Sequence, residues 1–135
     1  MVGSRPYADA SALVKLVLDE PESEALARFL ANRGGLITSR VATIEVRRAV
    51  SRVVTIGPEH EAVLSATWMG SHIVELDESL AEAAARIGPS LLRSLDAVHL
   101  ATAISVTEEA GDFVTYDRRL ADAARSLGLS VVAPA

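Results

Sequence analysis

Short apolar runs alternate along this chain with longer segments in which apolar residues recur every three or four positions. The runs, of which LITS is typical, predict strands at 5–9, 36–39, 72–76, 112–117 and 129–133. The helical spacing predicts helices over 11–18, 22–33, 41–54, 58–68, 78–88, 94–111 and 118–128. The pattern therefore predicts strands and helices in alternation, with no internal repeat and no linker.

Strands that alternate with amphipathic helices are typical of a parallel sheet that is covered on both faces. We therefore predict an α/β fold, a three-layer αβα sandwich around a central, mainly parallel sheet of about five short strands. At 135 residues the chain has the length of one domain, so we assign 1–135 to a single domain. We expect some of residues 1–5 not to be native sequence.

Several residues mark where the predicted helices begin and end. Gly34 and Gly35 are expected to end the helix over 22–33, and Gly128 the last helix. Ser94 is the expected N-cap of the helix over 94–111, because serine side chains accept the free N–H groups of a first turn.

Composition narrows the class of protein. Half of the residues are hydrophobic and 23% are charged, so the chain is expected to fold into a globular domain. It has no cysteine, which excludes disulfides, zinc–thiolate sites and thiol catalysis. There is neither a signal-peptide layout nor an apolar run of 18 residues. We expect a soluble, cytoplasmic protein with no membrane partner.

The net charge of −5 argues against binding to nucleic acid through an overall positive charge. Arginines nevertheless gather in one place, where Arg40, Arg47, Arg48 and Arg52 fall within thirteen positions. Two interpretations stay open for them: a solvated helix face, or guanidinium groups that contact phosphates.

Four acids stand apart from the polar clusters that hold most of the others. Asp9 ends the first predicted strand and Asp117 the fourth, while Asp96 lies in the first turn of a helix that is apolar nearly all round. Glu45 lies between Ile44 and Val46.

Each of these acids also has a purely structural interpretation. Asp117 suits the N-cap of the helix that begins at Arg118, and Asp96 suits the positive end of a helix dipole. Glu45 can pair with Arg48, three residues further along the same helix. Asp9 can lie in a solvated turn.

Taken together, the four acids favour a site. Ligands of parallel sheets bind at the carboxyl ends of the strands, where a doubly wound sheet can bring all four acids together. Carboxylates so close repel one another and need a cation. With no cysteine and three scattered histidines, the expected cation is Mg²⁺ or Mn²⁺. His99, one turn from Asp96, can orient it, although such a histidine is more often a satisfied core residue.

Four stretches carry a resemblance to a known family: YADASALVKL, TSRVATIEVRRAV, SLDAVHLATA and FVTYDRRLADAARSLGL. In this order they resemble the PIN domain, and more narrowly the VapC-type toxins, which are the ribonucleases of toxin–antitoxin pairs. The resemblance spans about residues 6–133. It implies a PIN-like fold whose acidic quartet, catalytic and metal-binding, carries over to Asp9, Glu45, Asp96 and Asp117.

The resemblance also implies an activity and partners. We expect an endoribonuclease, dependent on Mg²⁺ or Mn²⁺, that cleaves phosphodiester bonds of tRNA, rRNA or mRNA and so inhibits translation and growth. A VapB-type antitoxin and a homodimer are implied as well. Ser11 and Thr115 match the polar residues that assist the acids in the family. For contacts to the RNA backbone we select Arg47, Arg48, Arg118 and Arg119.

Other functions fit the residues less well. A haloacid-dehalogenase site needs a second aspartate at the position of Ser11, and a response-regulator receiver needs a strand-end lysine, whereas Lys15 lies in the first helix. The stronger alternative is a non-catalytic PIN-like module that binds RNA or protein. The intact quartet favours the nuclease.

Overall fold

A computed structural model describes residues 4–135, and its centre is a sheet of five short strands. The strands are β1 (Arg5–Ala8), β2 (Leu36–Ser39), β3 (Ser71–Val74), β4 (Ala110–Val114) and β5 (Val131–Val132). They lie in the order β3-β2-β1-β4-β5, and every neighbouring pair is parallel. The predicted sheet is therefore confirmed. Residues 1–3, part of the predicted domain and of the segment suspected not to be native, lie outside the described residues.

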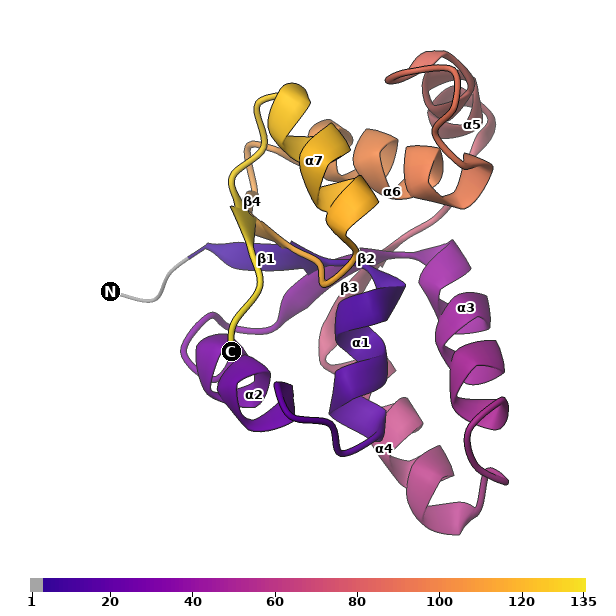
Figure 1. Ribbon diagram of the computed structural model, residues 1–135, viewed down its shortest axis with the longest axis vertical. Coiled ribbons are helices and arrows are strands. Elements are labelled where there is room, and N and C mark those ends of the chain that lie inside the picture. Colours follow the sequence, from indigo (N-terminus) through magenta and orange to yellow (C-terminus); the bar gives the residue numbers. More distant parts are fainter. Residues whose placement is uncertain (1–3) are drawn as a thin grey trace.

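Seven helices in the described part cover the two faces of this sheet. They are α1 (Ala10–Val17), α2 (Ser23–Leu30), α3 (Arg40–Ser51), α4 (Pro58–Met69), α5 (Glu78–Arg86), α6 (Ser94–Ser105) and α7 (Arg118–Ser126). Helices α1 to α4 lie on one side and α5 to α7 on the other, which gives the predicted three layers (Figure 1). In residues 4–135 no helix is both long enough and apolar enough to cross a bilayer.

The strand order creates a switch point between β1 and β4. The chain leaves β1 towards β2 and β3, and then returns to place β4 on the other side of β1. Ala8 is in register with Val114, and the N–H of Asp9 donates to the carbonyl of Val114 at 3.2 Å. The carboxyl ends of the two strands therefore lie side by side, where parallel sheets bind their ligands.

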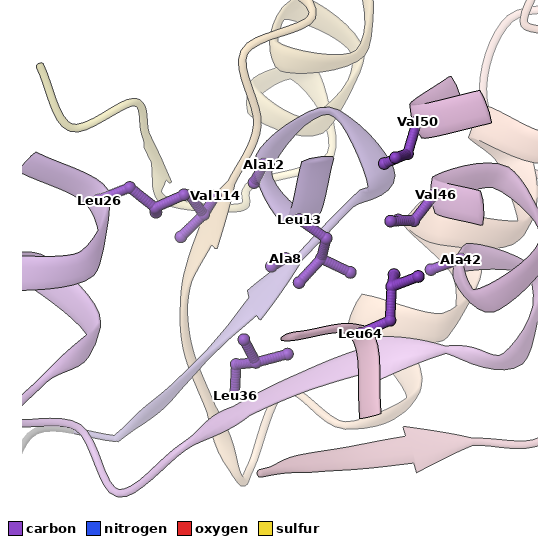
Figure 2. Close-up of a cluster of buried hydrophobic side chains, with 10 residues drawn as sticks. All are labelled: Ala8, Ala12, Leu13, Leu26, Leu36, Ala42, Val46, Val50, Leu64 and Val114. Carbon is purple, nitrogen blue, oxygen red and sulfur yellow. The ribbon is translucent and has the colours of Figure 1, made fainter. Parts of the chain in front are cut away.

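Neighbouring residues of β1 supply the two hydrophobic cores, because successive strand side chains point to opposite faces. Ala8 belongs to the core under α1 to α4, which Figure 2 shows, and Tyr7 belongs to the core under α6 and α7. The first core consists of ten buried side chains: Ala8, Ala12, Leu13, Leu26, Leu36, Ala42, Val46, Val50, Leu64 and Val114. The expected burial of the helix around Asp96 is confirmed for residues 97 to 103, whereas Leu95 and Ile104 of the same helix are exposed.

The helix predicted over 41–54 ends at Ser51, and the strand predicted over 112–117 ends at Val114. Two further boundaries, both of the helix that contains Asp96, are also wrong. The helix expected over 94–111 ends at Ser105, where the N–H groups of Val106 and Thr107 bond the carbonyls three residues back, at 3.2 and 3.3 Å, and β4 begins at Ala110. Ser94 is the first helical residue and not the N-cap. The N-cap is Arg93, whose carbonyl accepts the helical bond from Ala97 at 2.9 Å. Gly128 has positive φ directly after the C-cap Leu127 of α7, as expected. Gly34 and Gly35 also have positive φ but do not end α2, which stops at Leu30 with Ala31 as its C-cap.

Replacement of Leu13 by alanine tests the first core. Leu13 is fully buried, so Leu13→Ala should lower the free energy of unfolding by about 2–5 kcal/mol through lost burial and the cavity left behind. The measurement is urea unfolding followed by the fluorescence of Trp68, the single tryptophan. Leu91→Ala is the matched control, because Leu91 is 94% exposed and its loss should change stability by no more than about 0.5 kcal/mol. Equal effects of both changes would contradict this packing.

Candidate functional site

Asp9 is a buried carboxylate and does not lie in a solvated turn. It follows β1 as the N-cap of α1 and is 4% exposed. Its Oδ1 accepts from the Ser11 hydroxyl at 2.7 Å and from the Ala12 N–H at 3.1 Å. Its Oδ2 accepts from the Thr115 hydroxyl at 2.8 Å. Burial raises the pKa of Asp9, and these bonds and the neighbouring His99 oppose that rise in part.

The hydroxyls of Ser11 and Thr115 connect Asp9 to the turn between β4 and α7. The Ser11 oxygen accepts from the N–H of Tyr116 at 2.9 Å, and the Thr115 oxygen accepts from the N–H of Asp117 at 3.1 Å. Each hydroxyl therefore donates to Asp9, which follows β1, and accepts from a backbone N–H in the turn that follows β4. The structure thus brings together Asp9, Ser11, Thr115 and Asp117, four of the predicted site residues.

Asp117 caps α7, as predicted. Its Oδ1 accepts from the N–H groups of Arg119 at 2.9 Å and Leu120 at 3.2 Å. The side chain is exposed, and within residues 4–135 its Oδ2 has no hydrogen bond. One oxygen therefore serves the helix while the other stays available at the end of β4.

Asp96 is half-buried in the first turn of α6, and its carboxylate has no hydrogen-bond partner among the described residues. Burial raises its pKa, and the charges of Asp117, Asp9 and Glu45 raise the pKa further, against an opposing effect of His99. The four predicted acids therefore lie within electrostatic reach of one another.

Glu45 pairs with His99 and not with Arg48. Its Oε1 lies 2.6 Å from Nε2 of His99, and no ion pair between Glu45 and Arg48 exists in the described part of the chain. The structural interpretation of Glu45 by a local pair with Arg48 is therefore wrong. The expectation that His99 is a satisfied core residue is confirmed, because it is 1% exposed and bonded through both ring nitrogens.

The partner at the other ring nitrogen, Tyr7, was not singled out from the sequence. Its hydroxyl lies 2.7 Å from Nδ1 of His99. Burial, followed by the charge of Asp9, holds the pKa of Tyr7 well above its ordinary value, so the phenol keeps its proton. The sequence contains one signal for Tyr7. It precedes Asp9 by two residues, and residues two apart in a strand point to the same face of the sheet.

Comparison with known proteins decides the family. Residues 7–126 match the PIN domain. The chain is 38% identical over 128 residues to ribonuclease VapC46 and 42% identical over 132 residues to ribonuclease VapC35, both of Mycobacterium tuberculosis. Each alignment covers 95% of this chain and 96% of the relative. This chain belongs to the PIN-domain family, among the VapC ribonucleases.

Solved PIN-domain structures share the fold of this VapC-type chain. Mycobacterium tuberculosis VapC20, described as a Sarcin-Ricin loop cleaving toxin, superposes with a TM-score of 0.70 at 16% identity and covers 95% of this chain and 98% of its own. FitAB bound to an IR36 DNA fragment superposes with a TM-score of 0.71 at 18% identity, covering 95% and 94%. These two likenesses concern the fold alone.

The four selected arginines of this VapC-type domain lie in different settings. Arg118 lines a hollow with Thr115 and Asp117, and Arg119 lines another with Asp96. Both are exposed on the first turn of α7. Arg48 is exposed on α3, whereas the guanidinium of Arg47 bonds both carboxylate oxygens of Glu61 at 2.7 and 2.8 Å.

The acids of this PIN domain suit a hard divalent cation by their chemistry. Within residues 4–135, as the side chains stand, no group of three acids or histidines is arranged to hold a metal ion. The four carboxylates nevertheless supply only oxygen ligands, and a cation among them would relieve the repulsion that raises the pKa of Asp96. Binding of a cation would therefore require these carboxylates, above all the unbonded Asp96, to come closer together than they stand.

Asp96→Asn tests the repulsion in the metal-free protein. A carboxyl whose pKa is raised by folding stabilises the fold fully below its unfolded pKa of about 3.9, and this contribution is lost as the pH rises through the raised value. The Asp96→Asn variant has no carboxyl at this position, so it does not lose this contribution to stability as the pH rises. Its free energy of unfolding relative to wild type should therefore increase as the pH rises from about 4 towards 7.

Urea unfolding at several pH values, in the presence of a chelator, measures this difference. Asp19→Asn is the matched control, because Asp19 is exposed and lies away from the four acids at the end of α1. An Asp96→Asn difference that stays level or decreases with pH would contradict the electrostatic description.

Proposed function

We propose that this chain is a metal-dependent endoribonuclease, the toxin of a VapBC-type pair. The observation that carries the proposal is the arrangement at the switch point, where the buried Asp9 lies within electrostatic reach of Glu45, Asp96 and Asp117. The identity of 38–42% to ribonucleases named VapC supports it over nearly the whole chain.

The hydrogen bonds distinguish two kinds of oxygen on these acids. Oδ1 of Asp9, Oδ1 of Asp117 and Oε1 of Glu45 are engaged by the fold. Oδ2 of Asp9 accepts one hydrogen bond and so keeps a lone pair, while Oδ2 of Asp117 and Oε2 of Glu45 accept none from the described residues. We assign these three oxygens, with the carboxylate of Asp96, to hold Mg²⁺ or Mn²⁺.

The reaction is hydrolysis of an RNA phosphodiester. When bound, the cation supplies neutralisation of the charge that develops on the phosphate and activation of the attacking water. The protein contributes position: Ser11 and Thr115 fix both oxygens of Asp9, and α7 fixes Asp117 through the N–H groups of its second and third residues. Such preorganised charge is the main source of stabilisation in sites of this kind.

Arginines provide the contacts to the RNA backbone in this proposal. Arg118 and Arg119 stand beside Asp117 and Asp96 respectively, so a phosphate near the acids lies within reach of a guanidinium group. Arg48 is exposed on α3, about one turn from Glu45. Arg47 takes part only if RNA displaces Glu61, which makes its contribution the smallest of the four.

The toxin role brings partners. The proposed substrate is tRNA, rRNA or mRNA, and its cleavage inhibits translation and growth in the cytoplasm. The proposed partners are a VapB-type antitoxin, by analogy with the VapC relatives, and a second copy of this chain.

Two substitutions of Asp117 separate the role of its negative charge from its role as the N-cap of α7. Asn and Asp cap helices about equally well, so Asp117→Asn should keep stability near wild type while it lowers cleavage at least about 100-fold. Asp117→Ala should lower cleavage equally and also destabilise the protein by about 1 kcal/mol, because the cap to Arg119 and Leu120 is lost. Gel analysis of a pool of tRNA, rRNA and mRNA, with Mg²⁺ or Mn²⁺ and with chelator, measures cleavage.

Asp117→Asn purified in parallel also controls for contaminating nucleases. Cleavage that persists in this variant, or in chelator, would contradict the assignment. A wild type that binds RNA but cuts none of the pool with either cation would favour the non-catalytic binding module.

A further inference from the structure

A buried chain of hydrogen bonds leads from the sheet to the acidic site. The Tyr7 hydroxyl lies 2.7 Å from Nδ1 of His99, and Nε2 of the same ring lies 2.6 Å from Oε1 of Glu45. Tyr7 and His99 are each 1% exposed, whereas Glu45 is partly exposed on α3. These hydrogen bonds therefore join three separate elements, β1, α6 and α3, and end at Glu45, one of the four acids.

The identity of the donors follows from the groups involved. An ionised carboxylate only accepts hydrogen bonds, so Nε2 of His99 must carry the proton that it shares with Glu45. When the ring is neutral, Nδ1 is an acceptor and the Tyr7 hydroxyl donates to it, and when the ring is protonated Nδ1 donates to the Tyr7 oxygen. Every polar atom of the buried pair is thereby satisfied, in agreement with the absence of unpaired buried side-chain atoms from residues 4–135.

Packing holds the histidine ring in this orientation. The ring of Tyr7 stacks on Phe113, with centroids 5.3 Å apart and an interplanar angle of 9°. The imidazole of His99 meets the same tyrosine edge to face, at 5.9 Å and 74°. The Nε2–H is therefore directed at Glu45 by side chains that cannot reorient without opening the core.

We infer that His99, supported by Tyr7, is a positioning residue that holds Glu45 by Oε1 and so presents Oε2 to the cation. The inference rests on the proposed function, because it gives Glu45 a role as a metal ligand. Groups that orient a ligand in this manner commonly change metal affinity by roughly 10–100-fold. Because Glu45 is already held in place, its side chain loses less conformational entropy when the cation binds than a free glutamate would.

The test is calorimetric titration of Mn²⁺ into metal-free variants. His99→Leu should weaken Mn²⁺ binding by roughly 10–100-fold. His99→Gln should restore part of the affinity, because its amide can place an N–H near the position of Nε2. Tyr7→Phe keeps the ring and removes only the hydroxyl, so it should give a smaller loss. This variant tests the chain even if His99→Leu does not fold.

A double mutant separates positioning from general damage. If His99 acts through Glu45, then Glu45→Gln/His99→Leu should bind Mn²⁺ no more weakly than Glu45→Gln alone. Leu100→Ala is the matched control, since Leu100 is fully buried next to His99 and is not bonded to an acid. It should lower stability and leave the Mn²⁺ affinity unchanged.

The outcomes distinguish this inference from the proposed function. A wild type that binds no Mn²⁺ contradicts both. A wild type that binds, together with a folded His99→Leu or Tyr7→Phe of unchanged affinity, overturns the positioning role alone. The positioning role would likewise be overturned if the double mutant lost as much Mn²⁺ binding free energy as His99→Leu and Glu45→Gln lose together, because independent effects add.

Discussion

The desolvated carboxylate of Asp9 is the constraint on which the rest of the site depends. An acid that is 4% exposed is costly to keep charged, so the fold must surround it with donors. The hydroxyls of Ser11 and Thr115 and the N–H of Ala12 supply them. These donors belong to α1 and to the turn after β4, and satisfying Asp9 therefore fixes the junction of the two strands at the switch point. Stability and site geometry share the same bonds.

Two of the other acids share one arrangement, in which one oxygen accepts hydrogen bonds from the fold and the other accepts none from the described residues. Asp117 uses one oxygen to cap α7, and Glu45 uses one to accept from His99. Asp96 is the exception, because nothing in the described residues bonds it, and it bears the repulsion of the other three. A cation that relieves this repulsion would act mainly on Asp96, while Asp9 provides the rigid reference point.

The sequence predicted the parts of the fold that depend on local pattern. Strand LITS and the cap at Asp117 can be read from a few adjacent residues, and both are present. The end of the sixth helix was misplaced by six residues, because the polar stretch after Ser105 continues helical spacing while the pairing of Ala110 with Arg5 decides where β4 begins. Such pairing joins distant segments and is invisible in a local window.

The same limit explains which site contacts were missed. The neighbours of Asp9 could be named from a resemblance to a family, but the partner of Glu45 lies 54 residues away, on another helix. Spacing alone favoured Arg48, three residues along, and gave the wrong pair. Arg47 was selected for RNA without its tie to Glu61, which again comes from a separate helix. Long-range polar pairs of this kind need the packed structure.

We propose above that Asp9, Glu45, Asp96 and Asp117 together form one cation site. The most direct measurement is an anomalous difference map from crystals of the wild type soaked in Mn²⁺. We expect a peak between the end of β1 and the end of β4, in contact with Oδ2 of Asp9. No peak at these carboxylates at saturating Mn²⁺, or full occupancy at another place on the surface, would contradict it.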